Sequence, residues 1–202
     1  MKKKKSKSAS ARPKMKKKTA KQMKRSSGKK MASHHQSDRD IIEIILKDHK
    51  PLKHLIKVMK SDKSDFSEKK KAFEQFAPLL NAHARAEEEA LYTYLKKVKD
   101  LRQEGFEGQV EHGLADQMVE EAKRSSDKEL TAAQIKVLAE LVEHHIEEEE
   151  ETILPDFRKE SNLEDREDIG KKYLELKQVI EEEGSDDAPK ERTRDGSRNL
   201  YM

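Results

Sequence analysis

Two histidine–glutamate pairs at the same spacing are the residues of this chain best suited to chemistry. Glu87 follows His83 by four residues, and Glu149 follows His145 by four. Since four residues make about one turn of α-helix, each imidazole lies on the same helix face as its carboxylate. Both faces are otherwise apolar, so these polar groups are expected to point into a core. Groups of this kind need a partner there, because burying them unpaired costs several kcal/mol.

The two pairs belong to a short internal repeat. Residues 83–92, HARAEEEALY, parallel residues 145–154, HIEEEEETIL. For either segment alone, a solvated acidic face with one structural histidine would be an adequate explanation. Two copies at the same spacing instead indicate that the same functional helix pattern occurs twice in the chain.

Two further histidines fall on apolar helix faces. His49 lies one turn after Ile45, and His112 shares a face with Val119. Four histidines and two carboxylates in one core are hard to bury unless they share a positive charge, although a polar core without metal is the alternative. Two metal ions would satisfy all the groups, since carboxylates can bridge two ions and histidines can bind each. The predicted metal ligands are His49, His83, Glu87, His112, His145 and Glu149.

The neighbours of these residues are given lesser roles. His144 and His145 are adjacent, so only one can face the core, and His145 keeps the spacing to Glu149. His54 is expected to be solvated or to support the ligands. Tyr92 and Tyr94 either line the site or pack in the core, and packing is preferred. The flanking acids are expected to be solvated, or to orient the histidines through their ring N–H groups: Glu88, Glu89, Glu147, Glu148, Glu150 and Glu151.

The elements that must position these residues are all predicted to be helices, since no stretch alternates with period two. Pro51 is expected to kink the first helix or shift its start, Gly105 and Gly108 to form a loop, and Pro155 to stop the fourth helix. Thr131 begins a capping-box pattern. The sequence predicts an all-α fold, an up-and-down four-helix bundle with an additional C-terminal helix, from segments at about 41–59, 66–98, 109–122, 131–154 and 161–180.

Composition limits the chemistry. Charged residues make up 42% of the 202 residues and hydrophobic residues 33%, so part of the chain is expected to be disordered. There is no cysteine, which excludes disulfides and thiolate metal sites. Histidine and carboxylate ligands suit iron, manganese or zinc. No apolar run approaches the roughly 20 residues of a membrane span, so we expect no membrane association and a cytoplasmic location.

The charge is divided unevenly along the chain. Residues 1–33 hold 13 Lys and 2 Arg and no acid, a net of +15, so the rest of the chain has 29 basic against 41 acidic residues, a net of −12. We expect residues 1–33 to be a disordered basic tail, residues 34–183 the bundle, and residues 184–202 a polar C-terminal tail. The basic tail could bind nucleic acid or another polyanion non-specifically, or could be a solubilising tail without a partner.

The order His, His-x-x-x-Glu, His, His-x-x-x-Glu resembles that of the hemerythrin-like (HHE cation-binding) family. The resemblance covers about residues 37–183 and rests on Asp48-His49, His83-Ala-Arg-Ala-Glu87-Glu88, Glu111-His112 and His144-His145-Ile-Glu-Glu-Glu149-Glu150, with Pro155 following. It implies a non-haem di-iron centre, with iron expected ahead of manganese or zinc. By position, Glu87 and Glu149 would bridge the irons, His49 and His83 would bind one, and His112 and His145 the other.

One position departs from the oxygen-carrying members of that family. They have a second histidine one turn after the third-helix ligand, where this chain has Asp116. Asp116 is either an oxygen ligand or a supporting or solvated residue. The departure argues against reversible oxygen carriage and favours peroxide, nitric oxide or redox chemistry.

The resemblance therefore implies a di-iron protein that binds or reacts with a small ligand such as oxygen, nitric oxide or peroxide, as a sensor, scavenger or store. Two alternatives remain. One is an enzyme with catalase-like or iron–sulfur-repair activity. The other is a nucleic-acid-associated sensor that residues 1–33 anchor. The oligomeric state is not predicted by the sequence.

Overall fold

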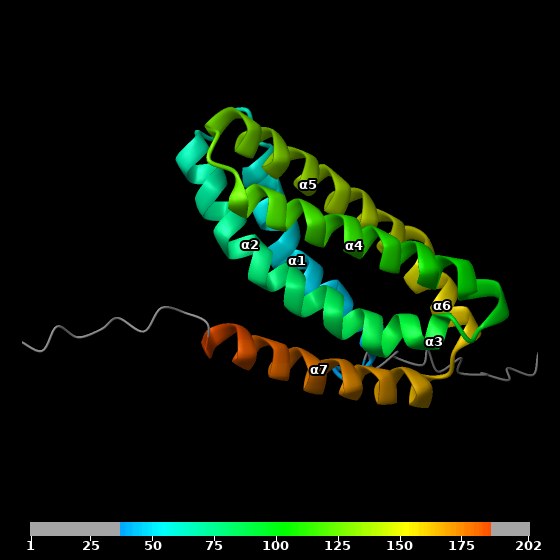
Figure 1. The fold of residues 1–202 in the computed structure, drawn as a ribbon. Helices are drawn as coiled ribbons and strands as arrows, with labels where there is room; N and C mark the ends of the chain where they lie inside the picture. The colour runs from blue at the N-terminus through cyan, green and yellow to red at the C-terminus, as the bar shows by residue number, and fades with distance from the viewer. Residues whose placement is uncertain (1–36, 187–202) are drawn as a thin grey trace, which may run out of the picture. The chain divides into compact units, whose positions relative to one another are not determined.

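The computed structural model describes residues 37–186, and side chains through residue 183, so the predicted basic tail lies outside the described residues. Within that range all regular elements are helical (Figure 1). The longer helices are α1 (Ile41–Lys60), α2 (Phe66–Glu87), α4 (Arg102–Arg124), α5 (Lys128–Glu148) and α7 (Leu163–Asp186). Shorter elements are a π-helical turn (Glu88–Tyr92), α3 (Thr93–Leu95), a 3₁₀ turn (Lys99–Leu101), a second π-helical turn (Glu149–Ile153) and α6 (Leu154–Glu160).

Helices α1, α2, α4 and α5 form the bundle. α1 packs against α2 and α5, and α4 packs against α5. The additional helix α7 packs against α1 and α2 (Figure 1). The prediction of an all-α bundle with an additional C-terminal helix is therefore confirmed. α7 continues to Asp186, three residues beyond the predicted boundary at residue 183.

Aspartate side chains cap the starts of three bundle helices. Asp40 accepts a hydrogen bond from the Ile42 backbone N–H at 3.0 Å, and Asp65 forms a capping box with Glu68. Asp127 caps α5, so the predicted start at Thr131 is wrong. Since Asp127 already satisfies the free N–H groups of the first turn, Thr131 lies inside the helix and donates its hydroxyl to the Asp127 carbonyl at 2.6 Å.

Pro51 and Pro155 both lie within helical segments. α1 runs through Pro51 without a shifted start. The prediction that Pro155 stops the fourth helix is also wrong, because the chain stays helical to Glu160. Pro155 lies in the first turn of α6, immediately after the π-helical turn Glu149–Ile153. A proline is tolerated in a first turn because its missing N–H is not needed for a bond to the preceding turn.

Gly105 and Gly108 lie inside α4, so the predicted loop and the start near residue 109 are both wrong. A Cβ at Gly108 would lie 2.6 Å from the Tyr92 ring. A Cβ at Gly105 would lie 3.1 Å from the Leu95 Cβ. The two glycines therefore allow α4 to approach the segment that follows α2, and this contact places Tyr92.

The core has two apolar clusters with a polar layer between them. On α1, Leu52 belongs to one cluster and Ile45 to the other, and buried His49 lies between them. On α5 and the turn after it, Val142 and Ile153 flank His145 and Glu149 in the same way. The polar layer is thus closed from both ends by packed side chains.

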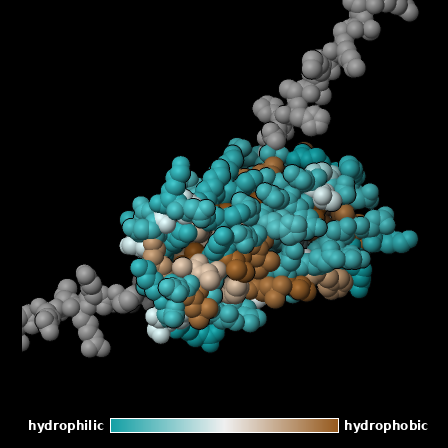
Figure 2. Space-filling view, turned by 90° about the horizontal axis from the view of Figure 1, so that it is seen from above, coloured by the Kyte–Doolittle hydropathy of each residue, from teal (hydrophilic) through white to brown (hydrophobic). Residues whose placement is uncertain are grey.

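The face seen in Figure 2 is mostly hydrophilic, with a hydrophobic patch on it. Among the described residues, large exposed apolar side chains include Phe106, Val110 and Leu114 on α4. None of the described helices has both the length and the hydropathy needed to cross a membrane.

Candidate metal centre

The six predicted ligand residues meet in the polar layer. Each of them is between 0% and 3% exposed. They form two groups in which the nitrogen and oxygen atoms lie within 4.8 Å of one another: His49, His83 and Glu149 in one, and Glu87, His112 and His145 in the other. The histidines are paired as the family resemblance implies, while their role as ligands stays a prediction.

Each carboxylate lies close to a histidine of both pairs. Glu87 Oε2 is 3.4 Å from His83 Nε2 and 3.7 Å from His112 Nε2. Glu149 Oε2 is 3.2 Å from His49 Nε2, and its Oε1 is 3.7 Å from His145 Nε2. Both glutamates therefore lie between the two histidine pairs, as a carboxylate shared by two ions must.

All four imidazoles present Nε2 to the centre and bond through Nδ1 to an oxygen outside it. Three of the partners are carboxylates, which can only accept, and the fourth is a tyrosine hydroxyl that gives its own proton to Asp48. Nδ1 is therefore the donor in each case, and Nε2 of the neutral ring is left with a free lone pair. That is the form of histidine that binds metal. The Nδ1 partners are Glu150 for His49 at 3.0 Å, Tyr173 for His83 at 2.8 Å, Glu88 for His112 at 3.2 Å and Glu111 for His145 at 2.6 Å.

Five buried polar atoms in this layer have no hydrogen-bond partner: His49 Nε2, His83 Nε2, both carboxylate oxygens of Glu87, and Glu149 Oε2. Such atoms are rare in folded proteins, because each retains its desolvation cost without a compensating bond. In addition, His112 Nε2 and His145 Nε2 lie 3.0 Å apart. The four imidazole Nε2 atoms and the carboxylate oxygens of Glu87 and Glu149 can thus all donate lone pairs into one shared space, so these six residues fit a pair of cations.

The protonation of the cluster supports this interpretation. Burial, with the nearby Glu149 adding to it, raises the pKa of Glu87 well above its usual value. Burial also lowers the pKa of His83, with His49 adding to the effect. Burial alone would raise the pKa of Glu149, but His145 and His49 outweigh it and lower that pKa. Burial alone would lower the pKa of His145, but Glu149 and Glu111 outweigh it and raise that pKa. Without a metal ion, protons on Glu87 and His145 are therefore favoured, and a metal ion would favour the ionised carboxylate and the neutral imidazole instead.

Tyr92 belongs to the centre, so packing is only part of its role. Its buried hydroxyl donates to Glu149 Oε1 at 2.7 Å and lies 3.3 Å from His145 Nε2. Its ring stacks on His112 with centroids 5.3 Å apart. The sequence signal for this contact was Gly108, whose missing Cβ makes room for the ring.

Tyr173 on α7 was not predicted to have a role at the site. Its hydroxyl accepts from His83 Nδ1 and donates to Asp48 at 2.6 Å, and Lys177 donates to the same Asp48 oxygen at 2.6 Å. The additional helix thus orients one of the four imidazoles. In the sequence Tyr173 shares a helix face with Ile169 and Leu176, and this apolar pattern gives no indication of its hydroxyl contacts.

Several other candidates lie away from the centre. Asp116, His54 and His144 are exposed. Burial still raises the pKa of Asp116, but this residue belongs to neither buried group of potential ligands. Tyr94 is half-buried and its hydroxyl lies 3.3 Å from Asp165. Asp116, which stands where oxygen-carrying members of the family have an additional histidine, is therefore in neither group of potential ligands.

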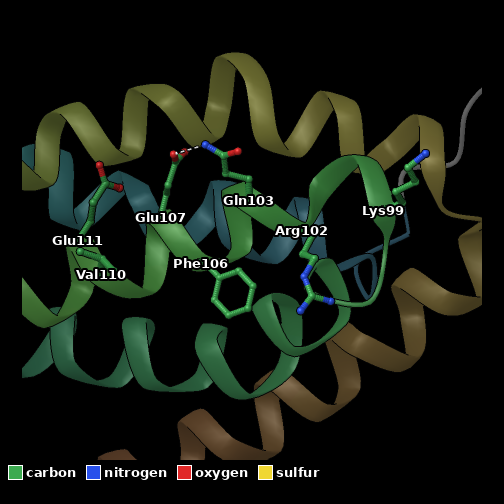
Figure 3. Close-up of a pocket in the computed structure, with 7 residues that line it drawn as sticks. All are labelled: Lys99, Arg102, Gln103, Phe106, Glu107, Val110 and Glu111. Carbon is green, nitrogen blue, oxygen red and sulfur yellow. Dashed lines mark hydrogen bonds between the residues drawn. The ribbon is translucent and has the colours of Figure 1, made fainter.

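A surface pocket of about 660 Å³ lies along the first turns of α4 (Figure 3). None of the six centre residues lines it. Glu111, the Nδ1 partner of His145, does line it, so the pocket reaches the outer side of the centre.

The fold and the site define a class of protein, the all-α bundles that have a buried histidine–carboxylate cluster suited to binding cations. The chain belongs to the hemerythrin HHE cation binding domain family, whose model matches residues 40–157. The match includes all six residues of the centre and ends before α7. Comparisons with curated proteins and with solved structures found no match.

Proposed function

We propose that this chain is a non-haem di-iron protein that binds or reacts with a small ligand such as oxygen, nitric oxide or peroxide, as a sensor, scavenger or store. His49 and His83 would bind one iron, and His112 and His145 the other. Glu87 and Glu149 would bridge the two ions.

The observation that supports a pair of ions best is the position of the two carboxylates. A single ion held by His49, His83 and Glu149 would leave both Glu87 oxygens unpartnered, and a single ion in the other group would leave the Nε2 atoms of His49 and His83 unpartnered. Glu87 and Glu149 each approach both pairs, with carboxylate–imidazole distances of 3.2–3.7 Å. Two ions sharing both carboxylates would satisfy the five unpartnered atoms together.

The ligand chemistry allows iron, and the family favours it. Imidazole and carboxylate without thiolate suit iron, manganese and zinc, and hemerythrin-type domains typically bind iron. Bound iron would supply a change of oxidation state and coordination positions that the protein leaves open. Asp116 replaces the additional histidine of the oxygen-carrying members and is exposed, so the centre would have fewer nitrogen ligands than theirs. This supports reactivity rather than reversible oxygen carriage.

The burial of the centre supports a small ligand. All six residues are at most 3% exposed, so a bulky substrate could not contact them without a large rearrangement. Around the ligand, Tyr92 would supply a hydroxyl proton beside Glu149, and the Nδ1 partners would hold the imidazoles in place. These residues orient the centre and exclude water from it.

The proposal is tested by adding oxygen, nitric oxide and peroxide separately to the reduced, iron-loaded chain and recording near-ultraviolet and visible absorption. At least one should change the spectrum of the wild type and of His54→Ala, an exposed histidine control, but not that of Glu149→Ala. No change with any of the three would contradict the proposal. Repeated consumption of added peroxide would instead support the catalase-like alternative.

A further inference from the structure

A third His-x-x-x-Glu unit lies on the surface of α5. His144 and Glu148 have the four-residue spacing of the two buried pairs but are shifted by one residue from His145 and Glu149. The shift turns them out of the core, so His144 is exposed and Glu148 half-buried. The proposed di-iron centre uses neither of them.

Glu111 on the neighbouring helix α4 completes a group of three with this unit. The nitrogen and oxygen atoms of Glu111, His144 and Glu148 lie within 4.8 Å of one another. One imidazole and two carboxylates form a ligand set for first-row divalent cations. At the surface, water can occupy the remaining coordination positions of the cation.

Glu111 connects this surface group with the centre. Its Oε2 accepts from His145 Nδ1 at 2.6 Å, while His145 Nε2 faces the buried layer. A carboxylate has two oxygens, so Glu111 can hold His145 with one and a cation with the other. Glu111 also lines the surface pocket beside Glu107 and is therefore reached from solvent (Figure 3).

The charges around the centre differ from one side to another. Behind His49, Glu150 is paired with Lys53 at 2.8 Å, and behind His83, Asp48 is paired with Lys177 at 2.6 Å. Among residues 37–183, by contrast, neither Glu111 nor Glu148 pairs with a lysine or arginine. A lysine is thus already paired with the carboxylate behind His49 and behind His83, whereas among the described residues Glu88 behind His112 and Glu111 behind His145 have no such pair. Behind His145, in addition, a second carboxylate and a second imidazole lie close enough to share a metal ion with Glu111.

We propose that Glu111, His144 and Glu148 form a surface site for a divalent cation, of the ferrous class, that passes ions to the buried centre. The inference rests on the proposed function, because it assumes that the inner groups hold ions. It gives His144 and Glu148 a role in how fast the centre fills, and none in how many ions the filled centre retains.

The test measures metal uptake by the full, metal-free chain. Ferrous ion is added without oxygen, a strong chelator is added after set times, and the ions retained per chain are counted. We expect the double variant His144→Ala/Glu148→Gln to fill about tenfold more slowly than wild type, the loss typical when groups supporting a metal site are removed. Both should finally retain the same number of ions. The matched control His54→Ala/Glu140→Gln removes the same groups at exposed positions and should fill at the wild-type rate.

The outcomes separate the two proposals. Equal filling rates in the wild type and the double variant would overturn the surface site and leave the di-iron centre standing. Failure of the wild type to retain any ion would reject both. If circular dichroism shows that the double variant does not fold, the single substitutions His144→Gln and Glu148→Gln provide the same comparison.

Discussion

At the scale of single residues, the centre depends on what lies behind each imidazole as much as on the six residues that face inward. A histidine on an apolar face can present either ring nitrogen, and the partner of the other nitrogen decides which one. Three glutamates and one tyrosine make that choice here, and they come from different segments of the chain. The ligand histidines were predictable from helical spacing. Glu111 and Tyr173 were not predicted as partners, because contacts between helices leave no spacing signal.

Removing the Tyr173 hydroxyl should weaken metal binding. Tyr173→Phe keeps the ring in the core but removes the acceptor for His83 Nδ1. We expect about tenfold weaker binding at the His49–His83 group, as is usual when a ligand histidine loses its outer partner. Competition with a chromogenic chelator measures the affinity. Tyr94→Phe, which removes a hydroxyl bonded to Asp165 instead, serves as the control, and equal affinities in the two variants would rule out this role.

Glu87 should make the metal-free chain less stable as pH rises. Its pKa is raised in the folded state, mainly by burial, so the unfolded state releases this proton at lower pH than the folded state does. Stability from this group is therefore present below the unfolded pKa near 4.5 and is lost as pH rises toward the folded pKa.

Denaturant unfolding of the chelator-treated chain at several pH values tests this prediction. Glu87→Gln should lose less stability than the wild type between about pH 5 and pH 8, because the amide does not titrate. Glu140→Gln, at an exposed position, should follow the wild type. The same slope in all three proteins would show that Glu87 is not held protonated.

At the scale of elements, the residues of the centre lie next to irregular turns. The π-helical turn Glu88–Tyr92 begins directly after Glu87, and the second begins at Glu149. Turns of this kind are frequent at functional sites because they change the direction of side chains within a helix. The apolar faces were enough to predict the helices. The wrong boundaries at Thr131, Pro155 and Gly105 came from caps, wide turns and close packing, which depend on neighbouring segments.

Filling the space at Gly108 should disturb the centre through Tyr92. A Cβ at this position would lie 2.6 Å from the Tyr92 ring, so Gly108→Ala should cost about 1–3 kcal/mol of unfolding free energy by overpacking. Gly113 is in the same helix, and a Cβ added there would meet no atom within 4 Å. Gly113→Ala should therefore gain about 0.5–1 kcal/mol, as alanine does over glycine inside a helix. Chemical denaturation measures both changes, and equal effects would contradict the steric role of Gly108.

At the scale of the whole molecule, the six residues lie within the family match while α7 lies outside it. Through the Tyr173 hydroxyl, helix α7, which lies beyond the matched domain, also contributes to the centre. Charge is divided just as clearly, with +15 on residues 1–33 and −12 on the remainder. This division of charge is read directly from the composition, which does not identify a partner. Binding of nucleic acid by the basic segment therefore stays a prediction.

Deleting residues 1–33 tests that prediction. If the segment binds polyanions, the full chain should be retained on DNA at low salt and released steeply as salt rises, because lysines displace counterions from phosphates. The deleted chain should not be retained at any salt concentration. Equal retention of both chains would exclude an anchoring role, and the absence of retention in both would favour a solubilising tail.

The number of iron ions retained per chain tests the dinuclear centre most directly. Protein purified without chelator, reconstituted with ferrous ion and desalted should retain roughly two ions per chain, the number that two bridging carboxylates and four histidines would hold. His83→Ala should retain fewer ions, and His54→Ala should match the wild type. A wild-type chain that folds normally but retains no iron, or retains the same amount as His83→Ala, would contradict the centre.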